Sequence, residues 1–334
     1  MPAEWEPHEA TWLAWPHQRS DWPGKFAPIP WVYAEIVRHL ARVERVRLLV
    51  QNRDLAEQAR RTLQKAGADL AAVEFFLCPT DRGWTRDSGP LFVKSSNGEV
   101  AVTNWLFNGW AKYGNWKRDN RIPAFIARRL RLRERRTGIV LEGGSIDVNG
   151  RGSLLTTEEC LLSPVQARNP GLTRQDLEEA FARFLGARHV LWLNRGIAGD
   201  DTHGHIDDIA RFTGPSTVVA AVEDDKGDPN YEPLRENLRL LRCMRDQDGN
   251  PLKVATLPMP EPVFFGGQRL PASYANFYIA NQLVLVPTFN DARDRLALNT
   301  LRRLFPGRRV TSIYCRDLVL GLGAIHCMTQ QQPA

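Results

Sequence analysis

The sequence contains no apolar run of about 18 residues, which is the length that a helix needs to cross a bilayer. We therefore expect no transmembrane segment and no membrane partner. The N-terminus reads MPAEWE, and it lacks the basic start and the apolar stretch of a secretory signal peptide. The predicted location of the protein is the cytoplasm.

Cysteine is scarce, because the 334 residues include only five, at positions 78, 160, 243, 315 and 327, with no C-x-x-C spacing. An odd and scattered set argues against a disulfide framework and against a structural zinc site. Cys78 and Cys160 stand in apolar, strand-like contexts, where a buried thiol is usually inert. Cys327 stands apart, because it follows a glycine-rich bend and lacks apolar neighbours on both sides.

The excess of basic residues is modest, with 44 Lys and Arg against 38 Asp and Glu, a net charge of +6. The densest basic run is Arg128–Arg136, which we interpret as the solvated face of a helix. No zinc-finger spacing or RNA-binding aromatic motif accompanies it. We therefore expect no nucleic-acid partner. A non-catalytic protein that binds nucleic acid through this run stays open as a remote alternative, and salt-sensitive binding to any oligonucleotide would favour it.

Short strands and helices alternate along the chain. The pairs Asn97-Gly98 and Asn149-Gly150 are hairpin turn signals. Thr173 is expected to open a helix that Gly186 ends, and Asn290 is expected to cap a helix that ends near residue 305. The strands are predicted at Val46–Val50, Val73–Leu77, Leu91–Lys94, Val100–Phe107, Ser145–Val148, Ser153–Thr156, His189–Leu193, Ser216–Val222, Lys253–Leu257, Phe277–Ile279, Leu283–Val286 and Arg309–Ile313.

This mixture of hairpins and single helices fits neither pure βαβ units nor an all-β fold. The chain contains no low-complexity segment and no long linker. It therefore indicates one compact α/β body, a single domain over residues 1–334, built from pieces of about 60–70 residues.

Four segments combine titratable residues with glycine in a way that core packing does not require. They read WTRDSGP (84–90), LEGGS (141–145), GDDTHGHIDD (199–208) and GLGAIHCMTQQ (321–331). The third segment places four carboxylates and two histidines within nine residues. Like charges at this density are costly unless a cation or a proton offsets them. A metal ion or a cationic substrate is the natural explanation.

The metal interpretation is tested by counting histidines. His-x-His-x-Asp-Asp differs by one residue from the His-x-His-x-Asp-His signature of metallo-β-lactamase-type hydrolases. Such sites need further histidines downstream, and only His326 follows position 205. The sequence therefore favours a cationic substrate, with no metal and no cofactor.

Taken together, these segments resemble the agmatine deiminase family, which includes the bacterial peptidylarginine deiminases. The resemblance runs in sequence order through MPAEWEPHE, TWLAWP, WTRDSGP, FNGW, EGGSIDVNG, LLTTEECLL, RNP, GDDTHGHIDD and IHCMTQQQP, over nearly the whole chain. It implies a pentein α/β propeller, with five pseudo-symmetric ββαβ-like units around a central active site. It also implies a homo-oligomer, a dimer or larger.

The resemblance implies a role for five residues. Cys327 is the expected nucleophile, and Asp87 and Asp207 are expected to grip the flat guanidinium of the substrate. His205 is the expected general acid and then general base. Glu142 is the expected partner that orients His205 and keeps it protonated.

Further expectations concern the substrate. Trp84 is expected to line the pocket, Asp201 to receive the far amine of agmatine, and Gly323 to shape the cysteine loop. His203 and His326 are expected to be structural, or to support the residues that contact the substrate without contacting it themselves. The segment GLGAIHC departs from the common family pattern GGGNIHC at Leu322 and Ala324, and His203 stands where Asp or Asn is common. These departures can alter the contacts with the substrate's tail.

The expected reaction is the hydrolysis of agmatine to N-carbamoylputrescine and ammonia, a step toward putrescine and the polyamines. A peptidylarginine deiminase or another guanidine deiminase stays open as an alternative. So does an amidinotransferase, whose product would depend on an acceptor amine.

Overall fold

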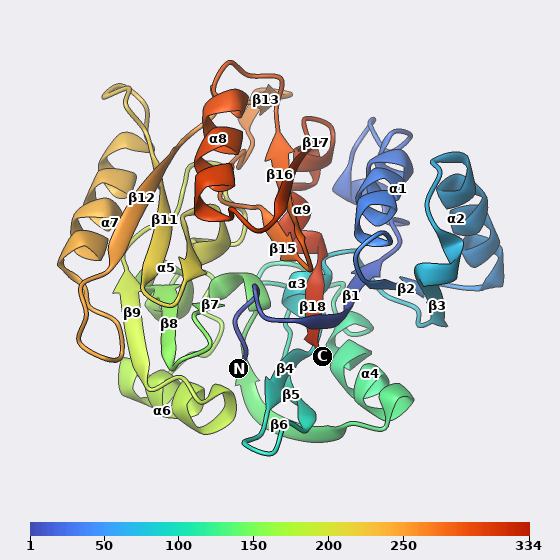
Figure 1. The fold of residues 1–334 in the computed structure, drawn as a ribbon, viewed down its shortest axis with the longest axis horizontal. Coiled ribbons are helices and arrows are strands. Elements are labelled where there is room, and N and C mark those ends of the chain that lie inside the picture. Colours follow the sequence, from blue (N-terminus) through green and yellow to red (C-terminus); the bar gives the residue numbers. More distant parts are fainter.

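The computed structural model describes residues 1–334 and contains five small sheets built on one plan (Figure 1). In each sheet, one pair of neighbouring strands is antiparallel and the next pair is parallel. The strand orders are β18 (Gln330–Pro333), β1 (His8–Ala14), β2 (Arg45–Val50), β3 (Val73–Leu77); β4 (Leu91–Lys94), β5 (Val100–Leu106), β6 (Arg133–Val140); β7 (Asp147–Val148), β8 (Ser153–Thr157), β9 (His189–Leu193); β10 (Ala210–Gly214), β11 (Thr217–Val222), β12 (Lys253–Pro258); and β15 (Tyr278–Ala280), β16 (Leu283–Thr288), β17 (Arg309–Tyr314).

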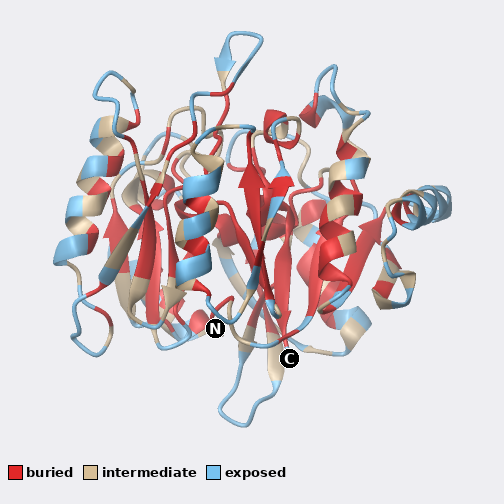
Figure 2. Cartoon of the chain, turned by 45° about the horizontal axis from the view of Figure 1, so that its top comes forward, coloured by how far each residue is buried: buried red, intermediate tan, exposed pale blue.

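A helix joins the last two strands of every sheet, because parallel neighbours need a crossover connection. These helices are α2 (Arg53–Lys65), α4 (Ile122–Leu130), α6 (Arg174–Leu185), α7 (Tyr231–Cys243) and α8 (Asp294–Leu304), and α1 (Ile29–Leu40) makes an additional crossover between β1 and β2. Figure 2 shows that the helices carry their exposed faces outward while the strands are mostly buried.

The two ends of the chain meet in one sheet. Strand β18 pairs antiparallel with β1, with Trp12 opposite Gln330, and the termini lie close together in Figure 1. The largest apolar cluster has 46 buried residues and runs from Leu13 to Met328. The first and last segments of the chain are therefore folded against each other. None of the helices has both the length and the apolar character that crossing a bilayer requires.

Most of the predicted strands are present, and the local turn chemistry explains why. Asn97-Gly98 lies in the turn between β4 and β5, and Asn149-Gly150 lies between β7 and β8. Thr173 forms a capping box with Asp176 at the start of α6, and Gly186 ends that helix at φ 72°. The predicted strand Ser145–Val148 is shorter than expected, because residues 143–145 form the 3-10 helix η4 (Gly143–Ser145) and only Asp147–Val148 pairs as β7.

Two predictions about local structure are wrong. Asn290 does not cap α8, which begins at Asp294; instead Asn290 adopts φ 58°, and the Asp294 carboxylate accepts the amides of Phe289 and Asp291. The basic run Arg128–Arg136 is not one helix face. Helix α4 ends at Leu130, and the run continues into β6, a largely exposed edge strand. Charged side chains on such an edge hinder pairing with other chains.

Candidate active site

The five predicted chemical residues lie in short connecting segments between the sheets. Asp87 is on α3 (Thr85–Ser88), Glu142 precedes η4, His205 and Asp207 flank the start of η5 (Ile206–Asp208), and Cys327 is on α9 (Ile325–Met328). Each segment leaves the last strand of one sheet and leads to the first strand of the next. All five side chains are buried. The repeated plan of the fold therefore brings residues from distant parts of the sequence to one place.

The double glycine of the second segment is required by close packing. A Cβ at Gly143 would lie 2.3 Å from the carbonyl oxygen of Arg86. A Cβ at Gly144 would lie 2.6 Å from His205 Nδ1 and 2.8 Å from Asp87 Oδ1. The Gly144 amide also donates to Asp87 Oδ1 at 3.0 Å. Glycine here leaves open the space toward which the catalytic side chains converge.

Asp87 and Asp207 are held by different donors. Asp87 Oδ2 accepts the Trp110 indole N–H at 2.9 Å, and Asp207 Oδ2 accepts His326 Nδ1 at 2.7 Å. Asp207 Oδ1 has no partner within the protein. Burial raises the pKa of Asp87 to about 6, although His205 opposes this shift. Burial also raises the pKa of Asp207, but His326, with His205 and Arg211, outweighs it, and that pKa lies below its usual value.

His205 lies between these carboxylates and Glu142. Its Nε2 is 3.5 Å from Glu142 Oε2, while its Nδ1 is 3.8 Å from Asp87 Oδ1 and 4.0 Å from Asp207 Oδ1. Nδ1 has no hydrogen-bond partner. Burial lowers the pKa of His205, but the charge of Asp87 and the contacts with Cys160 and Glu142 raise it well above its usual value. The ring is therefore protonated near neutral pH, with Nδ1 directed at the space beside Asp87.

Glu142 has a second partner that the sequence interpretation did not identify. Arg168 Nε lies 3.1 and 3.3 Å from the two carboxylate oxygens, and both side chains are fully buried. Burial raises the pKa of Glu142, but Arg168 outweighs it, and the net shift is downward. Arg168 also donates to the carbonyl oxygen of Thr202, which ties the carboxylate to the segment that carries His205.

The Cys327 thiol is held beside an amide that was also missed. Asn276 Nδ2 lies 3.1 Å from Sγ, and Asn276 Oδ1 accepts the backbone N–H of His326 at 2.9 Å. Asn276 belongs to the fourth of the connecting segments, after β12, so every one of them contributes a residue to the site. Burial and then Asp207, Asp208 and Asp87 raise the pKa of Cys327 well above its usual value. The free site therefore holds a neutral thiol, which a bound cation would acidify.

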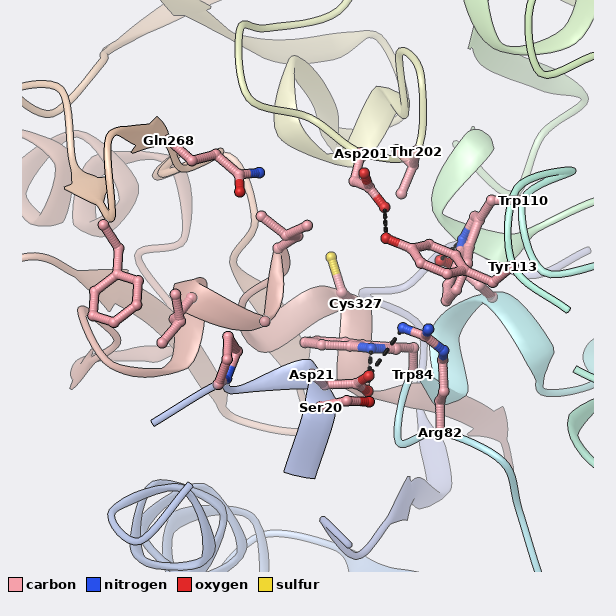
Figure 3. A pocket seen from close by; sticks show the side chains of 16 residues that line it. Ser20, Asp21, Arg82, Trp84, Trp110, Tyr113, Asp201, Thr202, Gln268 and Cys327 are labelled. Carbon is pink, nitrogen blue, oxygen red and sulfur yellow. Dashed lines mark hydrogen bonds and ion pairs between the residues drawn. The ribbon is translucent and has the colours of Figure 1, made fainter. Parts of the chain in front are cut away.

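A cavity of about 350 Å³ leads to Cys327, and Trp84, Trp110 and Tyr113 form part of its wall (Figure 3). Asp201 lies next to Tyr113, whose hydroxyl it accepts at 2.6 Å, and it pairs with Lys112 (Figure 3). Trp84 and Asp201 thus both line the cavity, and the expected role of Asp201 toward the far amine of the substrate stays a prediction.

Asp21 is a second acidic group of the cavity, and the sequence interpretation missed it. It accepts Arg82 Nη1 at 2.9 Å and the Trp84 indole N–H at 3.2 Å. Burial raises its pKa to about 6, although Arg82 opposes the shift. Of the three carboxylates that line the cavity, Asp21 and Asp201 therefore already pair with Arg82 and Lys112, and the third is Asp87.

The backbone is tightly packed at Gly323, and two of the departures from the family pattern, Leu322 and His203, fall at positions with positive φ. A Cβ at Gly323 would lie 2.8 Å from Trp84 Cζ3 and 3.2 Å from Cys327 Sγ, so the loop passes very close to both side chains. Leu322 adopts φ 67° and His203 adopts φ 64°, the left-handed region that favours glycine, asparagine and aspartate. His203 Nε2 lies 3.2 Å from Ser163 Oγ and makes no contact with the five chemical residues.

One cluster has the atoms to hold a metal ion. The ligand atoms of Glu142, Cys160 and His205 lie within 4.8 Å of one another. Cys160 is thus not the remote thiol of a strand that the sequence suggested, because it lies on α5 (Glu158–Leu162) beside His205. Arg168 already occupies both oxygens of Glu142, and its positive charge opposes a second cation there. All five cysteines are free thiols.

Comparison with known proteins adds the family context. The model of the Porphyromonas-type peptidyl-arginine deiminases matches residues 1–333. A Legionella pneumophila protein, named provisionally as an agmatine deiminase, is 38% identical over 100% of this chain and 94% of its own length. The agmatine deiminase of Ectopseudomonas mendocina is 37% identical over 100% of this chain and 95% of its own length.

Solved structures show the same likeness. The agmatine deiminase of Enterococcus faecalis superposes with a TM-score of 0.93 at 32% identity, and the match covers 100% of this chain and 95% of that one. A likeness of this extent confirms the pentein α/β fold that the sequence predicts.

Proposed function

Because the chain belongs to the family of Porphyromonas-type peptidyl-arginine deiminases, we propose that it is an agmatine deiminase. This hydrolase converts agmatine and water to N-carbamoylputrescine and ammonia. One observation carries the proposal: Asp87, Asp207 and His205 Nδ1 converge beside the Cys327 thiol at the end of an acidic cavity. This is the arrangement that attack on a bound guanidinium requires.

Binding of the guanidinium prepares the nucleophile. A guanidinium is planar and remains charged at physiological pH, so paired carboxylates hold it through charge-assisted hydrogen bonds. Asp87 and the free Oδ1 of Asp207 are the groups that face the space beside Cys327. The bound cation offsets their negative charges, which are what raise the pKa of Cys327 in addition to burial. The thiol then loses its proton to solvent and becomes a thiolate.

In the first half of the reaction, the Cys327 thiolate attacks the guanidinium carbon and forms a C–S bond. The tetrahedral adduct takes a proton from His205 Nδ1 onto the departing nitrogen, the C–N bond breaks, and ammonia leaves. A positively charged amidino-thioether remains on Cys327. His205 is now neutral, with Glu142 still facing its Nε2.

In the second half, neutral His205 takes a proton from a water molecule that attacks the same carbon. The new tetrahedral adduct collapses, the C–S bond breaks, and the thiolate of Cys327 leaves. The remaining proton of the ureido group passes to the ammonia released earlier. The sum is guanidinium plus water giving a urea and ammonium.

Asp201 favours agmatine over arginine and its peptides. Asp21 also lines the cavity, but it pairs with Arg82, another lining residue, whereas Lys112, the partner of Asp201, is about half exposed. Asp201 is therefore the carboxylate that suits the ammonium at the far end of agmatine, and the α-carboxylate of arginine would meet its negative charge. A peptidylarginine deiminase remains the alternative, because the matching family carries that description.

The covalent intermediate offers a direct test of this proposal. Acid quenching during agmatine turnover is expected to trap protein heavier by the mass of agmatine less ammonia, with the addition on the peptide that contains Cys327. Arginine incubated in parallel serves as the control. Repeated absence of the adduct while product accumulates would contradict covalent catalysis by Cys327.

Lys112 is expected to compete with the substrate's amine for Asp201. The two side chains form an ion pair at the rim of the cavity, and the lysine is about half exposed. The variant Lys112→Met should lower KM for agmatine by about two- to fivefold with little change in kcat, the size expected for a partly exposed pair. Steady-state kinetics measure this effect.

Two controls separate this competition from a general charge effect. The variant Lys65→Met removes an exposed lysine from α2, outside the cavity, and should leave KM unchanged. A guanidine with an uncharged tail should not benefit from Lys112→Met. An unchanged or higher KM for agmatine in Lys112→Met would remove Asp201 from the amine site.

Chelators are expected to leave turnover unchanged. The reaction above uses only side chains, and Arg168 already neutralises Glu142 in the one cluster with ligand geometry. Dialysis against EDTA, followed by an agmatine assay with and without added zinc, measures this. Activity that is lost on dialysis and restored by zinc would show that the Glu142, Cys160 and His205 cluster holds a metal.

Other features of the protein remain predictions. The five similar sheets support an arrangement of five units around a pseudo-fivefold axis, and the shared apolar cluster supports a single domain over residues 1–334. A homo-oligomer, the cytoplasm as location, a role in putrescine synthesis and the absence of a nucleic-acid partner are expected from the sequence alone.

A further inference from the structure

Glu4 is a buried carboxylate in the segment before β1, and it collects an unusual number of donors. The Ile279 amide donates to Oε1 at 2.8 Å, and Arg86 Nη2 donates to Oε2 at 3.2 Å. Arg211 Nη2 lies 2.9 Å from Oε1, close enough for an ion pair although not aligned as a hydrogen bond. Burial raises the pKa of Glu4, but Arg211, His326 and Arg86 outweigh it and hold that pKa well below its usual value.

His326 connects Glu4 to the site. Its Nε2 lies 2.8 Å from Glu4 Oε2, and its Nδ1 lies 2.7 Å from Asp207 Oδ2. An imidazole can donate from both nitrogens only when it is protonated, and ionised carboxylates only accept. The geometry therefore describes an imidazolium held between two carboxylates, one from the first residues of the chain and one from the site. All three side chains are buried.

We propose that Glu4 and His326 are positioning residues for guanidine hydrolysis, which keep Asp207 ionised and leave its Oδ1 free for the substrate. The inference rests on the proposed function, because it assigns the role of Asp207 as the carboxylate that binds the guanidinium. It goes beyond that function by placing residues from the start of the chain in the catalytic apparatus. It also makes specific the structural or supporting role that the sequence predicts for His326.

The two oxygens of Asp207 have different surroundings. Oδ2 is engaged by His326, whereas Oδ1 has no partner and lies 4.0 Å from His205 Nδ1. A fully buried carboxylate near other carboxylates would tend to take up a proton unless a cation offsets its charge. His326 is the only histidine that touches it at hydrogen-bond distance, and the same contact fixes its rotation.

The other charged groups around Asp207 do not replace this cation. They are Asp87 on α3, His205 and Asp208 on its own segment, Arg211 on β10, and His326 and Cys327 on α9. Asp87, Asp208 and a Cys327 thiolate make ionisation of Asp207 harder. Arg211 is itself engaged by Glu4 and Asp147, and the proton of His205 is given away during the reaction.

A structural role alone would be expected to change stability and nothing else. Glu4 also joins the N-terminal segment to β10 and β15, so its loss is expected to lower Tm. The test must therefore measure the ionisation of Asp207. The pH profile of kcat/KM does this, because binding of the guanidinium needs both site carboxylates ionised.

The variant Glu4→Gln keeps the shape of the side chain and removes its charge. The imidazolium is then left with one anionic partner instead of two, which weakens the cation beside Asp207. We expect kcat/KM for agmatine to fall by about 10- to 100-fold, the range seen for residues that orient a site's direct ligands. We also expect the acid limb to move to higher pH.

The sign of this pH shift follows from the wild-type site. There the pKa of Asp207 lies below its usual value while that of Asp87 is raised to about 6, so a single carboxylate governs the acid limb. In Glu4→Gln the pKa of Asp207 rises toward that of Asp87. Because two carboxylates then take up protons over the same pH range, the acid limb becomes steeper and moves to higher pH.

Two further variants complete the design. Glu6→Gln is the matched control, because Glu6 lies on the same segment and bonds only the Ala3 amide; its profile should match the wild type. His326→Asn keeps a neutral N–H donor for Asp207 and removes the charge, so it should also move the acid limb upward. In the double variant Glu4→Gln/His326→Asn, kcat/KM should fall by less than the product of the two single reductions. The reason is that Glu4 acts on Asp207 through His326, so the two residues are not independent.

The outcomes separate the inference from the proposed function. Agmatine hydrolysis by the wild type tests the function, and the variant profiles are compared on whichever guanidine the wild type hydrolyses. Acid limbs of Glu4→Gln and His326→Asn that coincide with the wild type would overturn the inference, whatever happens to Tm. If Glu4→Gln does not fold, the profile of His326→Asn decides alone.

Discussion

Replacing Cys327 with alanine should reduce agmatine turnover by about 10⁴-fold or more, the scale of loss when an enzyme loses its covalent nucleophile. The Sγ atom supplies the bond that holds the amidino group while ammonia leaves. Binding of agmatine should survive, because Asp87 and Asp207 remain and their mutual repulsion is still offset by the cation. Ammonia release measures turnover, and calorimetry measures binding.

Cys243→Ala is the matched control, because Cys243 is the one exposed cysteine and lies on α7, outside the cavity. Its turnover should equal that of the wild type. Cys327→Ala that retains a tenth of the wild-type rate would show that water attacks the guanidinium directly. The mechanism would then lose its covalent step.

Replacing Asp87 with asparagine should lower kcat/KM for agmatine by about 10²- to 10³-fold, because a buried group aimed at the reacting charge contributes several kcal/mol. The amide keeps the contact with Trp110 or with Gly144, but it cannot balance a guanidinium. The charge of Asp87 also raises the pKa of His205. Loss of that charge should therefore move the basic limb of the pH profile to lower pH.

The wild-type profile carries a related expectation. Asp87 must be ionised to bind the cation, and its pKa is raised to about 6, so kcat/KM should fall as pH drops through that value. Asp119→Asn is the control, because this buried carboxyl lies outside the catalytic cluster and its pKa is raised to about 8. Its oxygens accept the backbone amides of Asp81 and Arg82, so Asp119 represents a buried carboxyl with a structural role. Equal losses in both variants would mean that Asp87 has only a structural role.

The segments that carry the chemical residues could be found from sequence because each has its own local signal, whereas the roles of the residues within them came from the family resemblance. Glycines next to Glu142, a dense acidic segment around His205, and a glycine-rich bend before Cys327 are all visible without a structure. The sequence does not show that these segments lie close together in space, because the sheets bring the five connecting segments to one place.

The residues that sequence reasoning missed lack such a local signal. Asn276 stands in an ordinary turn, and only the fold shows that it reaches the Cys327 sulfur. Arg168 looked like part of a loop motif until its partner Glu142 was known. Glu4 lies 322 positions before His326, and no periodicity connects them. A buried charge is recognised by its partner, and partners are a property of the fold.

The wrong predictions have the same origin. Asn290 is a good helix-capping residue by type, but α8 begins at Asp294 with Arg293 at the N-cap position, and the Asp294 carboxylate accepts the Phe289 amide. The run Arg128–Arg136 has no apolar period that would mark the change from helix to strand at Arg131. Local propensity does not distinguish between alternative helix starts, or between helix and strand, in segments of this kind.

A comparison of three substrates decides the substrate class: agmatine, free arginine and a blocked arginine peptide are assayed in parallel for release of ureido product and ammonia. We expect hydrolysis of agmatine, with at most weak turnover of the other two, because Asp201 lines the cavity that receives the tail. Hydrolysis of the peptide with a higher kcat/KM than agmatine, or no hydrolysis of any of the three, would contradict this expectation.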